Sequence, residues 1–240
     1  MSGHSKWSTI KRQKGVADAK RGQQFTKLAM AIVIAVKQGG GVTDPEFNFK
    51  LRLAVDRARS FNMPKENIER AIQKAKGGMD SGDLHEALYE GFAPGGAALM
   101  IEAVTDNKQR TVSEVKNTLE KNGGTMGNQG SVSYLFNRVG EIAVETSGKT
   151  SDEIFELAIA IGSEDFLEEG TDAVFYVDPS KLYEAKKMLE EQGIKVSSAE
   201  LVYKPLNVVP VDEGTKEKIT GIIEKLEELG DVQNVFANFA

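Results

Sequence analysis

The 240-residue chain contains no cysteine, which excludes disulfide bonds, thiolate nucleophiles and cysteine-ligated zinc sites. Histidine is nearly absent as well, because the two histidines, His4 and His85, lie far apart in the sequence. The longest apolar run, from Leu28 to Val36, is much shorter than the roughly 20 residues that span a bilayer. No apolar segment directly follows the basic N-terminus, as it does in a secretory signal. Together these features predict a cytoplasmic protein without membrane contact.

What the chain does contain is typical of a soluble globular protein. Apolar residues make up 40% and charged residues 28% of the sequence, which argues against disorder. A length of 240 residues favours two or three domains over one compact core.

Positive charge is concentrated at one end of the chain. Residues 1–79 contain sixteen Lys and Arg against six Asp and Glu, a net charge of +10. Residues 80–240 contain fourteen against thirty, a net charge of −16. The densest basic stretch is 1–27, where Asp18 is the single acidic residue. This asymmetry predicts that one domain meets nucleic acid or another polyanion.

We predict that the nucleic-acid contacts come from this N-terminal stretch. Its lysines and arginines can neutralise phosphates and release counterions, which supplies most sequence-independent affinity. His4 or Trp7 can stack on a base or sugar, although the single tryptophan could instead anchor the terminus on its domain. The predicted nucleic-acid-binding residues are His4, Lys6, Trp7, Lys11, Arg12, Lys14, Lys20, Arg21 and Lys27.

Residues 1–79 are predicted to be all helical. Apolar residues recur at helical spacing from Phe25 to Val36, from Phe47 to Phe61 and after Pro64. The glycines at 39–41 and 77–78 are expected to end helices, and Asp44-Pro45 to cap and begin the second one. Residues 8–21 have no apolar stripe, so we expect this basic segment to order on a polyanion.

After Gly78 the pattern changes to strands that alternate with helices. Residues 131–204 read as βαββαβ, which is the ferredoxin-like order. A strand at 206–211, a helix at 213–229 and a strand at 231–238 would complete another sheet that begins at 87–121. We therefore predict an α+β protein with a basic helical domain (1–79), a discontinuous α/β domain (80–130 and 205–240) and an acidic ferredoxin-like domain (131–204) inserted into it.

The segment from Ala143 to Thr150 matches the loose form of a phosphate-binding loop, which suggests an NTPase that uses Lys149 as an alternative function. However, the strict motif has glycine at the position of Ala143. Asp152 and Glu153 would also repel an anion at the start of the next helix. Thr150 and Glu153 are better explained as a helix-capping box.

Two further patterns favour structural interpretations. The acidic residues in 164–169 lack the spacing of an EF-hand and are typical of a solvated surface. The βαββαβ order also occurs in RNA-recognition modules, which stack bases on central-strand aromatics. Phe175 and Tyr176 lack the accompanying glycine–aromatic signature, so we expect at least one of them in the core. We predict no catalytic residue, no cofactor and no metal site.

Several motifs in fixed order resemble the YebC/PmpR family across essentially the whole chain. They are Gly3-His4-Ser5-Lys6-Trp7, Gly39–Gly41, Asn62-Met63-Pro64, Tyr89 to Gly96, Thr105 to Thr111, Asn122 to Gly124 and Gly130 to Phe136. The resemblance implies a helical N-terminal domain followed by two ferredoxin-like domains, one of which interrupts the other. It also implies a probable transcriptional regulator that binds DNA, while relatives include mitochondrial translational activators and ribosome-associated factors. It implies no catalytic residues.

The leading hypothesis is therefore a non-enzymatic regulator of gene expression that binds DNA through its basic domain. The alternative is a ribosome-associated translation factor that binds ribosomal or transfer RNA, which the lack of a recognisable helix-turn-helix motif favours. The acidic α/β domains are expected to contact a protein or the ribosome. A pure protein-interaction scaffold is a third hypothesis.

Overall fold

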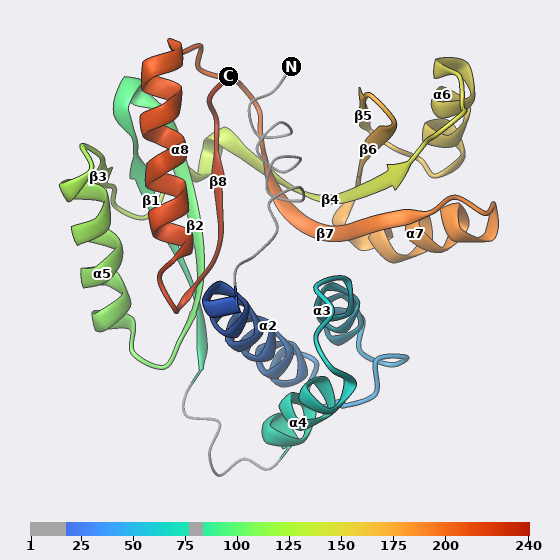
Figure 1. Ribbon diagram of the computed structural model, residues 1–240, viewed down its shortest axis with the longest axis horizontal. Coiled ribbons are helices and arrows are strands. Elements are labelled where there is room, and N and C mark those ends of the chain that lie inside the picture. Colours follow the sequence, from blue (N-terminus) through green and yellow to red (C-terminus); the bar gives the residue numbers. More distant parts are fainter. Residues whose placement is uncertain (1–17, 77–83) are drawn as a thin grey trace.

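The computed structural model describes residues 18–76 and 84–240 of the chain. These residues form a helical unit and two antiparallel β-sheets that carry helices, so the chain is an α+β protein (Figure 1). Within the described ranges, no helix is both long and apolar enough to cross a membrane.

The helical unit consists of three helices around a shared apolar core. Leu28, Ile32 and Val36 recur at helical spacing on the first helix and are almost completely buried. They belong to one cluster with Leu51 of the second helix and Ile68 of the third. The helices are α2 (Asp18–Gln38), α3 (Phe49–Ser60) and α4 (Lys65–Lys76). The helical character predicted for this region is confirmed for residues 18–76.

The loop between α2 and α3 differs from the prediction. Asp44 and Pro45 form a turn, in which the Asp44 carboxylate accepts a backbone N–H two residues further on. The helix begins later, at Phe49, because Asn48 caps it by accepting a backbone N–H of the first turn at 3.1 Å. Phe47 therefore lies before the helix and is 79% exposed, instead of contributing to the predicted apolar stripe.

The first sheet has the strand order β3-β1-β2-β8, and all neighbouring strands are antiparallel. Two helices cover one face, where Val115 and Leu119 of α5 and Ile219 and Ile222 of α8 are buried in a common core. The elements are β1 (His85–Phe92), β2 (Ala98–Thr105), α5 (Lys108–Lys121), β3 (Thr125–Met126), α8 (Glu213–Glu227) and β8 (Val232–Ala237).

The segment that leads into α8 is not the regular strand predicted at 206–211. In this described segment only Val209 forms a bridge, which is parallel to Phe239. The contact continues past Pro210, because the N–H of Val211 donates to the Ala240 carbonyl at 3.3 Å, but it is too short to form a regular strand. The helix and strand predicted after this segment are present as α8 and β8.

The second sheet has the order β5-β6-β4-β7 and is antiparallel throughout. Its chain order is βαββαβ with the first and third strands in the centre, which is the ferredoxin-like arrangement. Phe175, Leu182 and Leu189 are fully buried between the sheet and its helices. The elements are β4 (Phe136–Glu145), α6 (Ser151–Ala160), β5 (Asp165–Glu169), β6 (Asp172–Val177), α7 (Leu182–Glu191) and β7 (Val196–Pro205).

The faces of the two sheets that carry no helix pack against each other. Met100 and Phe236 of the first sheet lie in one buried cluster with Ala143, Tyr176 and Val202 of the second. Because each sheet is covered by helices on one side and by the other sheet on the opposite side, both have buried faces.

The helical unit docks on the second sheet through α3. Arg52 lies over the ring of Tyr183, with its guanidinium carbon 4.1 Å from the ring centroid. Lys186 of α7 pairs with Asp56, and Arg57 reaches Glu200 of β7 at 3.4 Å. Figure 1 shows α3 below β7 and α2 beside the lower end of the first sheet, so the helices meet both sheets.

Glycine is required at two turns of the first sheet for different reasons. Gly95 has a φ of +77°, in the left-handed region that favours glycine. Gly124 has no positive φ. A Cβ atom at Gly124 would lie only 2.8 Å from the backbone oxygen of Phe92, so close approach of the backbone requires glycine there.

Candidate nucleic-acid interface and interdomain cavity

Most of the residues predicted to bind nucleic acid precede the described part of the chain. Lys20 and Arg21 fall in the first turn of α2, and the Arg21 side chain is exposed. The residues outside the described ranges are His4, Lys6, Trp7, Lys11, Arg12 and Lys14. Their assignment to nucleic-acid binding therefore stays a prediction.

Lys27 has a structural role instead of a place on the exposed basic surface. Only 8% of the residue is exposed, and its Nζ donates to the backbone carbonyl of Glu227 at the end of α8. The last carbonyls of a helix carry a partial negative charge that a lysine ammonium stabilises. Lys27 thus joins the helical unit to α8, and its buried ammonium does not contribute to the exposed cationic surface that could contact phosphates.

Further exposed cations, which the sequence analysis did not select, lie on α4. Arg70 and Lys74 are one turn apart and Lys76 ends the helix, whereas Ile68 and Ala71 face the core. Among the described residues, no carboxylate lies within 4.0 Å of these three cations. The helical periodicity of 65–76 could have identified them, because every cation lies away from the buried stripe.

The connection between α3 and α4 bears on the choice between DNA and RNA. The two helices are separated only by residues 61–64, and Asn62 has a φ of 56° within this turn. A turn of this length joins the helices of a helix-turn-helix unit. The length of this turn is compatible with a helix-turn-helix unit, although Glu66 and Glu69 make the first half of α4 acidic.

The capping-box interpretation of Thr150 is confirmed. Its hydroxyl accepts the backbone N–H of Glu153 at 3.3 Å, and the Glu153 carboxylate accepts the N–H of Thr150 at 2.7 Å. The hydrogen bond from the Thr150 N–H, together with one from the Thr150 hydroxyl at 3.0 Å, lowers the pKa of Glu153, so a carboxylate occupies the helix N-terminus where a phosphate would have to bind.

The residues of the second sheet that could suggest an RNA-recognition module or a metal site have partners within the fold. Phe175 and Tyr176 are both buried, one under the helices and one between the sheets, so neither can stack on a base. Asp165 pairs with Lys204, and Glu168 accepts a hydrogen bond from Ser151 at 2.9 Å. Over residues 18–76 and 84–240, no group of three or more histidine or acidic side chains is arranged to hold a metal ion.

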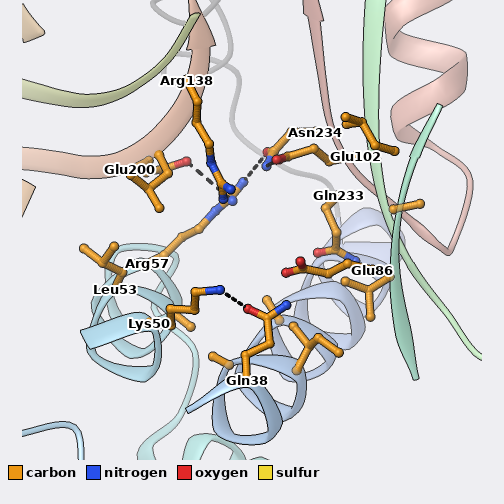
Figure 2. Close-up of a pocket in the computed structure, with 18 of the residues that line it drawn as sticks. Gln38, Lys50, Leu53, Arg57, Glu86, Glu102, Arg138, Glu200, Gln233 and Asn234 are labelled. Carbon is orange, nitrogen blue, oxygen red and sulfur yellow. Dashed lines mark hydrogen bonds and ion pairs between the residues drawn. The ribbon is translucent and has the colours of Figure 1, made fainter. Parts of the chain in front are cut away.

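A cavity of about 320 Å³ lies where the helical unit meets both sheets. Lys50 and Arg57 of α3 reach into it from one side, and Glu86 of β1 and Gln233 of β8 from the other (Figure 2). Arg138 of β4 enters between these walls. Its volume is at the lower end of the range for small-molecule sites.

Arg57 holds the three units around this cavity together. One guanidinium nitrogen donates to the side-chain oxygen of Asn234 at 2.8 Å, and another lies 3.4 Å from the Glu200 carboxylate. The Asn234 amide in turn donates to Glu102 at 3.0 Å. One arginine of the helical unit therefore connects β8 of the first sheet to β7 of the second.

Burial raises the pKa of Glu102, and the carboxylate of Glu86 raises it further. The hydrogen bond from Asn234 and the charges of Arg138 and Arg57 act in the opposite direction, but they do not outweigh burial. Burial also raises the pKa of the neighbouring Tyr203 hydroxyl. Glu102 and Tyr203 thus lie in a poorly solvated part of the cavity, whereas Lys50, Glu86 and Arg138 line it as exposed residues.

Two family models match consecutive parts of the chain. Residues 5–78 match the TACO1/YebC protein N-terminal domain, and residues 84–239 match the TACO1/YebC second and third domain. The chain belongs to the TACO1/YebC family. This finding confirms the resemblance that the ordered motifs indicated.

Relatives in the TACO1/YebC family are similar over their full length. A probable transcriptional regulatory protein of Trichlorobacter lovleyi is 46% identical over 239 residues, covering 100% of this chain and 96% of the relative. A protein of the same description from Aquifex aeolicus is 45% identical, with 100% and 96% coverage. The crystal structure of a conserved hypothetical protein from Aquifex aeolicus is similar with a TM-score of 0.87 and 44% identity, covering 96% of this chain and 95% of that one.

Proposed function

We propose that the chain is a non-enzymatic regulator of gene expression that binds DNA through its basic N-terminal domain. Nucleic-acid binding would then belong to the predicted domain 1–79. Contact with a partner would belong to the predicted acidic domains, 80–130 with 205–240 and 131–204. The alternative target is ribosomal or transfer RNA, in which case the chain is a translation factor that relieves stalled elongation. The names of the bacterial relatives, probable transcriptional regulatory proteins, support the regulatory role.

The division of charge carries this proposal. Residues 1–79 have a net charge of +10, whereas residues 80–240 have a net charge of −16. Arg70, Lys74 and Lys76 extend the cationic surface along α4. An acidic body would repel nucleic acid from every side except that of the helical unit. Glu90 and Asp231 are carboxylates of the α/β units. Glu90 accepts a hydrogen bond from the backbone of Val132, and Asp231 accepts one from the hydroxyl of Thr111, which is typical of structural groups and not of catalytic ones.

Replacing Lys11, Arg12 and Lys14 by alanine should flatten the salt dependence of binding. Each lost phosphate contact reduces the slope of log K against log salt by about 0.7–0.9, so three contacts amount to about two to three units. Filter binding of a duplex oligonucleotide over a salt series measures this slope, and the same series with structured RNA shows which polymer retains affinity at higher salt.

The matched control removes Lys116, Lys149 and Lys187, three exposed lysines of the acidic units, and changes the total charge by the same amount. Its slope should stay that of the unmodified protein, because these lysines lie on units that repel phosphate. An unchanged slope in the N-terminal triple variant would refute the assignment of those residues.

The inserted unit offers a surface suited to a protein or ribosome contact. Residues 131–204 contain seven basic and fifteen acidic residues, a net charge of −8. Phe155 and Ile159 lie one turn apart on α6 and are 54% and 64% exposed. Phe166 of the edge strand β5 lies beside Phe155, with ring centroids 6.1 Å apart. An apolar patch within an acidic surface fits a basic partner protein.

Replacing both Phe155 and Ile159 by serine should reduce co-sedimentation with purified ribosomes by at least tenfold, while oligonucleotide binding stays unchanged. The reason is that two adjacent exposed anchors are lost from the contact, whereas the basic unit is untouched. Tyr134→Ser with Leu206→Ser is the control, because these side chains are 69% and 53% exposed on another part of the surface. Equal sedimentation of both double variants would exclude this patch as the contact.

A further inference from the structure

The interdomain cavity contains charges of both signs. Lys50 and Arg57 enter from α3 and Arg138 from β4, whereas Glu86 and Glu102 belong to β1 and β2 of the first sheet (Figure 2). Glu200 of β7 also lines the cavity beside Arg57, so the second sheet contributes a carboxylate as well as Arg138.

Some of these charges already have partners and others do not. Arg57 lies against Glu200, and Glu102 accepts from an amide of β8. Lys50 donates to Gln38, which is neutral and exposed.

Among the described residues, the remaining charges have no opposite charge within ion-pair distance, although Arg138 attracts the Glu102 carboxylate from further away. In the described part of the chain, no carboxylate lies within 4.0 Å of Arg138 and no cation within that distance of Glu86. The guanidinium of Arg138 instead lies 5.9 Å from the ring of Tyr203. Lys50 and Arg138 on one side and Glu86 on the other therefore remain free to pair with an occupant.

Two buried hydrogen-bond donors at the cavity also have no acceptor in the described ranges. Arg57 Nε and Gln233 Nε2 are shielded from solvent and have no hydrogen-bond acceptor among the described residues. A buried donor without an acceptor is costly. Both residues line the cavity, so a polar occupant could satisfy them after a small side-chain movement.

We infer that this cavity binds a small zwitterion, namely a free amino acid or a dipeptide with an unmodified ammonium and carboxylate. The carboxylate lies toward Lys50 and Arg138, and the ammonium toward Glu86 and Glu102. Leu53, of the helical unit, supplies part of an apolar lining for the side chain. A volume of about 320 Å³ admits a molecule of this size but not a polymer.

Simpler ligands fit the lining less well. A plain anion would leave Glu86 without a partner and place a second negative charge near Glu102, whose ionisation burial already disfavours. A plain cation would meet the same difficulty at Lys50 and Arg138. A zwitterion satisfies both walls at once.

Binding would also join the three units, because the two ends of the ligand contact different units. A ligand that binds only the folded chain stabilises it by an amount that rises with the ligand concentration. The inference rests on the cavity alone, so it stands or fails independently of nucleic-acid binding.

The first test measures the melting midpoint and the calorimetric affinity of the full-length protein with the common amino acids and a set of alanyl dipeptides. The best of them, as the free zwitterion, should raise the midpoint saturably. Its N-acetylated form and its amide should each bind at least tenfold more weakly, because each lacks one charge. No saturable effect from any of these compounds, or equal binding of the blocked forms, overturns the inference.

The second test identifies the cavity as the site. Glu86→Gln should bind the free zwitterion at least tenfold more weakly and should lose the preference for a free ammonium over an acetylated one. Lys50→Gln should lose the preference for a free carboxylate over an amide. The controls Glu164→Gln and Lys149→Gln alter exposed charges of the second sheet and should bind as the unmodified protein does. Full preference retained in Glu86→Gln overturns the site even if the ligand binds elsewhere.

Discussion

Replacing Glu90 by alanine should lower the free energy of unfolding by about 3–5 kcal/mol, the largest effect expected of a single substitution here. Glu90 lies on β1 and is only 4% exposed. Its carboxylate accepts the backbone N–H of Val132 at 2.6 Å, of Gly130 at 2.7 Å and of Ser133 at 3.0 Å. Alanine would leave three donors without an acceptor, and the N–H of Val132 is buried.

The location of these hydrogen bonds adds to their importance. Residues 130–133 lead from the first sheet into β4, the central strand of the second. Val132 is itself fully buried in the cluster between the two sheets. Loss of the Glu90 carboxylate would therefore loosen the connection between the sheets as well as one turn.

Acid should weaken the same contact. Burial alone would raise the pKa of Glu90, but the hydrogen bonds from Val132, Gly130 and Ser133 outweigh burial and lower it. A lowered folded-state pKa gives stability that is present above the unfolded value, near 4.3, and is lost as the pH falls through the folded value. The difference between Glu90→Ala and the unmodified protein should therefore shrink below about pH 4.

Urea unfolding at neutral and acidic pH measures both effects. Glu156→Ala is the control, because Glu156 is exposed on α6 and should change stability by less than about 0.5 kcal/mol. A Glu90→Ala variant as stable as this control at pH 7 would contradict the role given to the carboxylate.

The fold was largely predictable from local signals. The glycines at 39–41, the capping box at Thr150 and the βαββαβ order all depend on residues close in sequence, and each identified its element correctly, whereas the glycines at 77–78 lie outside the described residues. The prediction that α3 begins at Asp44-Pro45 is wrong for a related reason. Asp44 and Asn48 are both good N-cap residues and lie within five residues of each other, so local sequence does not choose between them. Asn48 caps the helix because its amide also donates to the carbonyls of Ala35 and Val42, and α2 contributes one of them.

The candidate sites were less predictable because they depend on contacts between distant residues. Lys27 was expected at a phosphate, yet its partner Glu227 is 200 residues further along the chain. The cavity likewise combines Lys50, Arg138 and Glu86, which come from three units. The periodicity of apolar residues predicts single helices and strands but not how the sheets and helices pack against one another. The cavity is therefore visible only in the folded chain.

Replacing Asp231 by alanine should lower the free energy of unfolding by about 2–4 kcal/mol. One carboxylate oxygen of Asp231 accepts from the hydroxyl of Thr111 at 2.6 Å, from Arg110 at 2.7 Å and from the hydroxyl of Thr105 at 2.9 Å. Both threonines are fully buried. Alanine would therefore remove the charged acceptor that both buried hydroxyls share between α5, β2 and the turn before β8, and would leave them only each other and the Asn107 carbonyl as partners.

Burial alone would raise the pKa of Asp231, but hydrogen bonds from Thr111, Arg110 and Thr105, together with the charge of Arg110, lower it. The sign is the same as for a salt-bridged carboxylate: the stabilisation is present above the unfolded value, near 3.9, and is lost as the pH falls through the folded value. Asp231→Asn keeps one oxygen but loses the charge, so its stability at pH 7 should lie between those of Asp231→Ala and the unmodified protein.

Asp106 provides a control that shares the same arginine. Its carboxylate accepts from Arg110 at 2.8 Å, but its side chain is 57% exposed, against 13% for Asp231. An exposed pair contributes only about 0–1 kcal/mol, so Asp106→Ala should unfold at almost the urea concentration of the unmodified protein. If the two alanine variants were equally destabilised, the ion pair with Arg110 would be responsible. A loss confined to Asp231→Ala would assign the stability to the hydrogen bonds that Asp231, and not Asp106, accepts from the two buried threonine hydroxyls.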